Sequence, residues 1–133
     1  MERIADKRTQ LGLTIAIVLT GVMVWRTSAL TYLPNVGGTV PEIWGIPFKG
    51  DAFIGLTALV VAFLLYRFRN LNIWALGIAW QVAGLADLLV AYVVQNMHPL
   101  GSAPYFVVPI GMVMHSVALY LIWRNRENFE MHG

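Results

Sequence analysis

The sequence predicts an all-α integral membrane protein, a bundle of four membrane-spanning helices with both termini on the same side. Of its 133 residues, 58% are hydrophobic and only 12% are charged, and the mean hydropathy is +0.65. Such a chain is too apolar for a soluble domain of ordinary composition. Its apolar residues fall into four runs, each long enough to cross a bilayer as a helix. We therefore expect residues 1–133 to form one membrane domain.

The expected spans cover residues 10–32, 51–67, 71–95 and 104–124. A signal peptide would also start with basic residues and an apolar run, but no small-x-small cleavage site follows and Arg26 interrupts the run. Residues 34–50 hold three prolines and four glycines, which predicts a turn-rich outer loop, either a lid over the bundle or a partner contact. Asp51 is then expected to cap the second span.

Basic residues indicate the orientation of the spans. Only Lys49 lies clearly at the outer ends, whereas the opposite ends carry seven basic residues: Arg3, Lys7, Arg8, Arg67, Arg69, Arg124 and Arg126. Cytoplasmic loops are enriched in Lys and Arg, so both termini are expected in the cytoplasm. Residues 34–50 and 96–103 are then expected on the other side of the membrane.

Composition also excludes several function classes. The net charge is +2, but the basic residues form no stripe along a helix, which argues against nucleic-acid binding. The chain has no cysteine, which removes disulfides, thiolate metal sites and thiol nucleophiles. No catalytic motif is present, so an enzyme is the least favoured class, and we expect no metal site.

The third span carries a carboxylate, Asp87, at a depth where lipid would otherwise surround it. An ionisable side chain within a spanning helix normally faces the bundle interior and has a partner, so it marks a candidate functional site. At 3.6 residues per turn, one arc of about 120° holds the small and polar residues of this span. These residues are Gly77, Trp80, Gln81, Gly84, Asp87 and Ala91. We expect this face to point inward.

Arg26 and Asp51 are expected at a similar depth to Asp87, in the outer half of the bilayer. One cation and two carboxylates would neutralise charges that are each costly alone. The cluster could be a structural ion pair that fixes helix order. It could instead leave one carboxylate free to exchange a proton or bind a cation. Arg26 could also extend to the outer headgroups.

His115 is expected near the middle of the membrane, four residues after Gly111. A small residue at this spacing would let a ring approach the helix beside the imidazole, so His115 is a candidate tetrapyrrole ligand. The alternative is a buried histidine bonded to Gln81 or to a carboxylate. His98 falls in an outer turn and His132 in the tail, so two histidines of one chain cannot ligate the same haem.

Three pieces of the sequence resemble a family of small bacterial four-helix membrane proteins to which no function is attached. They are the pair Gly50-Asp51, the motif W-x-x-x-G-L-x-D-L from Trp80 to Leu88, and V-P-x5-H from Val108 to His115. The likeness covers about the last two-thirds of the chain, and Gln81 stands where that family usually has Asn. The resemblance implies a bacterial inner-membrane protein.

Two main function classes remain open. The first is a non-catalytic accessory or assembly subunit of a larger membrane complex, because the chain is small and lacks catalytic motifs. The second is a proton- or cation-coupled carrier, or a small-molecule-binding membrane protein, that acts as an oligomer because four helices alone enclose little cavity. Tetrapyrrole binding through His115 ranks third. The expected partners are membrane lipid together with other membrane subunits or further copies of the chain.

Overall fold

A computed structural model describes residues 2–130, with side chains from Gln10 onward. Over this range the chain is helical, without strands. The long elements are α1 (Glu2–Val22), which continues into the 3-10 helix η1 (Met23–Thr31), α2 (Gly45–Arg67), α3 (Leu71–Met97) and α4 (Pro104–Arg124). Shorter ones are η2 (Leu33–Asn35), η3 (Glu42–Trp44) and α5 (Arg126–Glu130). Four helical segments are long and apolar enough to cross a membrane, which agrees with the expected number: Gln10–Asn35, Glu42–Arg67, Leu71–Met97 and Pro104–Arg124.

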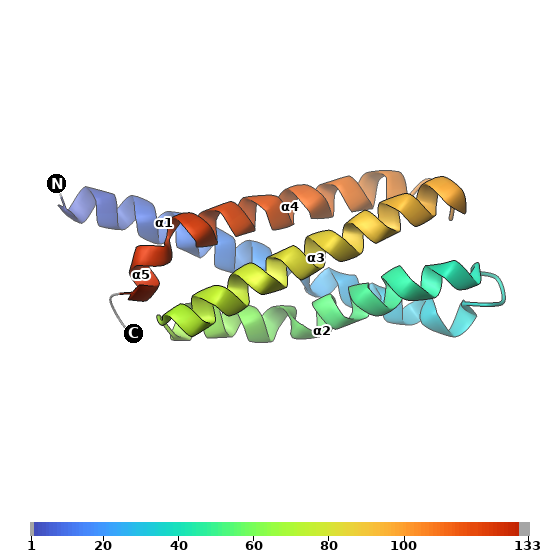
Figure 1. Cartoon of the computed structure of the whole chain (residues 1–133), viewed down its shortest axis with the longest axis horizontal. Helices are drawn as coiled ribbons and strands as arrows, with labels where there is room; N and C mark the ends of the chain where they lie inside the picture. Colours follow the sequence, from blue (N-terminus) through green and yellow to red (C-terminus); the bar gives the residue numbers. More distant parts are fainter. Residues whose placement is uncertain (1, 131–133) are drawn as a thin grey trace.

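The spans run alternately up and down the long axis of the molecule (Figure 1). Both termini lie at one end, here called the terminal end, together with the turn between α2 and α3. Residues 32–44 and 98–103 lie at the opposite end, here called the loop end. The first span contacts α2 and α4, and α3 contacts these same two helices, so the four spans close into a bundle.

Helix α2 begins at Gly45, six residues before the expected start, so the prediction of a loop over residues 34–50 is wrong in its last part. Pro47 lies in the first turn of α2, where its missing N–H has no carbonyl partner to lose. Asp51 is consequently not a cap and lies one turn and a half inside the helix. Trp44 is buried, and its indole N–H donates to the carbonyl of His98 at 2.8 Å, which ties the two loop-end connections together.

Residues 125–130, after α4, are mostly polar in sequence, yet they fold back onto the bundle. Residues Arg126–Glu130 form α5, and the Phe129 side chain is fully buried in a core cluster with Leu13, Leu65 and Ile122. Asn125 lies at the turn, where its side-chain amide donates to the carbonyl of Leu121 at 2.7 Å. His132 lies outside the described residues.

The polar and small face expected for α3 points inward. Gly77, Trp80, Gln81, Gly84 and Ala91 are buried, and Asp87 is partly buried. Apolar core clusters lie on either side of this face. One, toward the terminal end, includes Met23 and Trp80, and the other, toward the loop end, includes Ala29 and Leu88. Arg26 and Asp87 fall between them along their helices, so the charged groups occupy the gap between two apolar layers.

Candidate functional site

Arg26 is the centre of a polar cluster to which all four spans contribute. Its side chain, on η1, is completely buried. Nε donates to Asp51 Oδ1 of α2 at 2.6 Å, and Nη2 donates to Asp87 Oδ2 of α3 at 2.5 Å. Nη1 lies 2.8 Å from Nε2 of His115, on α4. The structure thus brings together three residues expected to share one depth and adds the histidine. It rules out a guanidinium that extends to the headgroups.

The hydrogen bonds continue from His115 toward the terminal end. Nδ1 of the imidazole lies 2.6 Å from Oε1 of Gln81, and the Gln81 amide donates to the Thr20 hydroxyl at 2.8 Å. That hydroxyl donates to the carbonyl of Ala16 at 2.7 Å. A guanidinium can only donate, so Nε2 of His115 accepts and the ring carries its proton on Nδ1. The histidine of this network is therefore neutral.

The charges in the cluster do not balance if both acids are ionised. One guanidinium faces two carboxylates and a neutral imidazole, which leaves one excess negative charge inside the bundle. Asp51 and Asp87 bond to two nitrogens of the same guanidinium, so two ionised carboxylates would lie close together and repel, which favours a proton on one of them. One proton or one monovalent cation would make the cluster neutral.

Glycines permit the close approach of the helices around the cluster. A Cβ at Gly50 would overlap the carboxylate of Asp87, and one at Gly84 would overlap the imidazole of His115. A Cβ at Gly55 would overlap the backbone of η1 at the residue after the arginine. Small residues let neighbouring backbones of membrane helices come into contact. Each of these glycines therefore makes room for one member of the cluster or for the backbone that carries it.

The residues around His115 do not fit a tetrapyrrole ligand. Both ring nitrogens already make hydrogen bonds, so iron at Nε2 would have to displace Arg26. Gly111 does not lie beside the imidazole as expected, because its position faces Leu88, and Gly84 fills that place instead. Among the described residues, no group of three His, Cys, Asp or Glu side chains is placed to hold a metal ion.

Two threonines beside the cluster, Thr20 and Thr57, were not predicted from the sequence as part of the site. Thr20 accepts from Gln81, and Thr57 accepts from the indole N–H of Trp80 at 2.9 Å. The Trp80 ring in turn lies 5.4 Å from the imidazole of His115, centroid to centroid. Both hydroxyls also donate to the carbonyl four residues earlier, the ordinary helical partner. In the sequence, the one feature that could have indicated these threonines is a polar residue within an apolar run.

A cavity of about 330 Å³ opens beside the cluster at the loop end. Arg26 and Asp51 are the charged residues that line it, and its aromatic lining is formed by Trp25, Tyr32, Trp44 and Phe48. The rest of the wall is one serine and aliphatic side chains of η1, α3, α4 and the connection before α4. This loop-end cavity is the space from which a small molecule can meet the charged groups.

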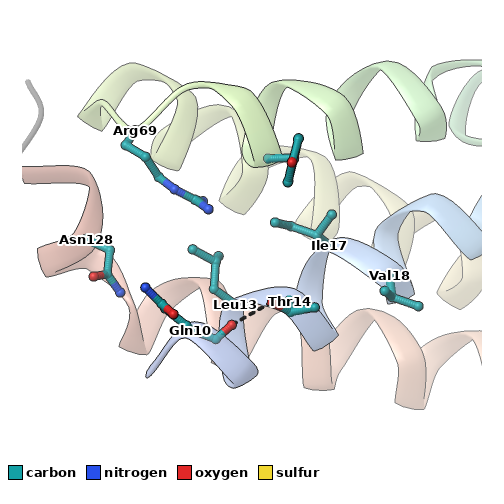
Figure 2. A pocket seen from close by; sticks show the side chains of 8 residues that line it. Gln10, Leu13, Thr14, Ile17, Val18, Arg69 and Asn128 are labelled. Atoms are coloured by element: carbon teal, nitrogen blue, oxygen red, sulfur yellow. Dashed lines mark hydrogen bonds between the residues drawn. The ribbon is translucent and has the colours of Figure 1, made fainter. Parts of the chain in front are cut away.

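A second cavity, of about 470 Å³, lies at the terminal end between α1, α2 and α5. Figure 2 shows Arg69 directed into it, opposite Gln10 and Thr14, with Asn128 on another side. Arg69 is already engaged, since Nη1 donates to the carbonyl of Leu65 at 2.6 Å and the guanidinium lies 5.6 Å from the centroid of the Phe129 ring. No member of the Arg26 cluster lines this cavity.

Comparison of the chain with protein-family models, with curated proteins and with solved structures gives no match. The resemblance to small bacterial four-helix proteins stays a prediction.

Proposed function

We propose that this chain is an integral membrane protein that binds a small molecule in the loop-end cavity and couples binding to one proton held by Asp51 and Asp87. The observation that carries the proposal is the attachment of two carboxylates to one buried guanidinium. A structural ion pair needs only one carboxylate. The second one either holds a proton or leaves a buried charge without compensation, at a cost of several kcal/mol.

The position of the cavity supports coupling between the proton and a ligand. Asp51 belongs to the cluster and also lines the cavity, and its side chain is 18% exposed, whereas that of Arg26 is 0% exposed. A ligand in the cavity can therefore contact a carboxylate that shares the proton. The charge and hydrogen bonds of the ligand would change the affinity of the two carboxylates for that proton. By thermodynamic reciprocity, the proton would change the affinity of the cavity for the ligand.

The accessory-subunit function is the other proposal that the sequence supports. The spans expose many apolar side chains, among them Phe53, Phe63, Phe106 and Val113. Such side chains suit lipid, a partner subunit or a second copy of the chain equally well, so they favour none of these. The cavity and the unbalanced cluster favour binding. A stoichiometric partner that stays with the protein in mild detergent would favour the subunit function instead.

We further propose that both termini lie in the cytoplasm of a bacterial inner membrane. The support is the charge distribution, because Arg67, Arg69, Arg124 and Arg126 all lie at the terminal end of the bundle. In this orientation the loop-end cavity faces the non-cytoplasmic side. A ligand would then enter from outside the cell or from the outer leaflet.

Infrared spectroscopy of the purified protein tests the shared proton directly, through the C=O stretch of a protonated carboxyl group. We expect one protonated carboxyl at neutral pH, with a band that shifts in D₂O. Asp51→Asn or Asp87→Asn should each remove it, because the remaining carboxylate balances Arg26. The matched control is Glu42→Gln, an exposed acid outside the cluster, which should leave the band unchanged. A parent protein without this band at any pH at which it stays folded would overturn the proposal.

A further inference from the structure

The lining of the loop-end cavity offers a ligand a carboxylate and no accessible cationic side chain. Arg26 lines the cavity, but its side chain is 0% exposed and its Nε, Nη1 and Nη2 are directed at three cluster residues. Asp51 is 18% exposed. No other Lys, Arg, Asp or Glu of the described chain lines this cavity. The only charge that a ligand can contact there is therefore negative.

The walls of the cavity suit a cation that carries apolar groups. Phe48 stacks on Tyr32 at 5.5 Å and on Trp44 at 5.4 Å between ring centroids, so three of the rings that line the cavity form one stack. The hydrogen bond from Trp44 to the carbonyl of His98 holds one end of this stack in place, and Tyr32, which is 48% exposed, is its most accessible ring. Aromatic faces attract cations through the ring quadrupole, and more strongly where water is excluded.

We propose that the loop-end cavity binds a small organic cation, an ammonium group with apolar substituents, in exchange for the proton that Asp51 and Asp87 share. This inference rests on the proposed function and names its ligand class. In the exchange, the cation enters the cavity, the shared proton leaves to solvent, and the freed Asp51 oxygen faces the ammonium group. One positive charge replaces another, so the cluster stays neutral throughout.

Other ligand classes fit the cavity less well. An anion would meet the exposed carboxylate of Asp51 while the guanidinium stays buried behind it. A bare divalent metal ion needs several oxygen or nitrogen ligands, and the cavity supplies one carboxylate and one serine among aromatic and aliphatic side chains. An organic cation needs one counter-charge and an apolar, aromatic enclosure, which is what the lining residues provide.

Titration calorimetry of the detergent-purified protein with benzyltrimethylammonium tests the proposal. The matched neutral probe is neopentylbenzene, which has the same shape with carbon in place of nitrogen. Repeating the titration in buffers of different ionisation enthalpy counts the protons released. We expect saturable binding of the cation, no saturable binding of the neutral probe, and release of up to one proton per cation, with affinity that falls as the pH is lowered.

Two variants test separately how the carboxylate and the aromatic lining contribute to binding of the cation. Asp51→Asn should abolish binding of the cation. Tyr32→Leu should weaken it by roughly five- to tenfold, because one aromatic face is lost. Tyr92→Leu is the matched control, since Tyr92 is exposed to the same extent, 49% against 48% for Tyr32, and does not line the cavity. Tyr32 is a surface residue, so its variant stays informative even if Asp51→Asn fails to fold.

Each outcome of the titration decides between distinct claims. Equal binding of the charged and neutral probes, or no binding of the cation, would overturn the ligand class. If the infrared band of the shared proton is present in that case, the proposed proton site stands without this ligand. Binding of the cation without proton release would overturn the exchange. If the infrared band is also absent, the proton site itself would be overturned.

Discussion

The carboxylate of Asp87 packs directly on the backbone of Gly50, at a point where any side chain on residue 50 would overlap it. The two residues belong to α3 and α2, and the neighbour of Gly50 is Asp51. The contact therefore brings the second carboxylate to the same guanidinium as the first. A glycine on one helix thus decides whether the acids of two helices meet.

Gly50→Ala should destabilise the protein by about 1–3 kcal/mol, because the added methyl group forces Asp87 away from Arg26 or pushes α2 from α3. Thermal or chemical denaturation in mild detergent measures the loss. Gly21→Ala is the matched control, since its Cβ would lie 3.6 Å from Cβ of Ala62, an ordinary contact. Equal stability of the two variants would contradict the close packing of Asp87 on residue 50.

Removal of the carboxylates should be strongly non-additive. Asp51→Asn or Asp87→Asn alone should cost about 1 kcal/mol, because the remaining acid still balances Arg26 and the amide keeps the shape. The double variant leaves the buried guanidinium without a counter-charge, at a cost of roughly 3–5 kcal/mol. Denaturation of the parent, both single variants and the double variant gives the four free energies of unfolding of a double-mutant cycle. Additive costs would mean that each acid stabilises the fold independently and that neither compensates for the other.

Phe129→Ala should cost about 3–5 kcal/mol, because it removes a fully buried ring that α5 adds to the core cluster of Leu13, Leu65 and Ile122. Phe63→Ala is the control of the same residue type, with a side chain that is 57% exposed on the outer face of α2. It should change the melting temperature little. A small effect of Phe129→Ala would show that α5 is not part of the stable core.

The cysteine-free sequence allows a direct test of orientation by single cysteines and a membrane-impermeant thiol reagent. A cysteine at Gly38, at the loop end, should be labelled from outside intact cells, whereas one at Asn72, at the terminal end, should be labelled only after lysis. Both positions are exposed. The reverse pattern would place the loop-end cavity on the cytoplasmic side and would overturn the proposed orientation.

The sequence alone predicted the helical class and four apolar helices long enough to cross a membrane, and it singled out Arg26, Asp51 and Asp87 as candidates for one charged cluster. Long apolar runs can satisfy their backbone groups within a membrane only as helices, so length and hydropathy sufficed for the fold. Asp87 was found because a carboxylate within such a run is expensive. Its helical phase also indicated the inward face that the structure shows.

Only the tertiary structure decided which groups contact one another. It extended α2 to Gly45 and folded Phe129 back into the core, since packing against other helices outweighed the local signals of proline, glycine and charge. It also placed Nε2 of His115 against Nη1 of Arg26. These contacts join residues far apart in the chain, and their energies depend on distances of closest approach. Such distances are set by where the glycines of neighbouring helices meet, which no local pattern in the sequence reveals.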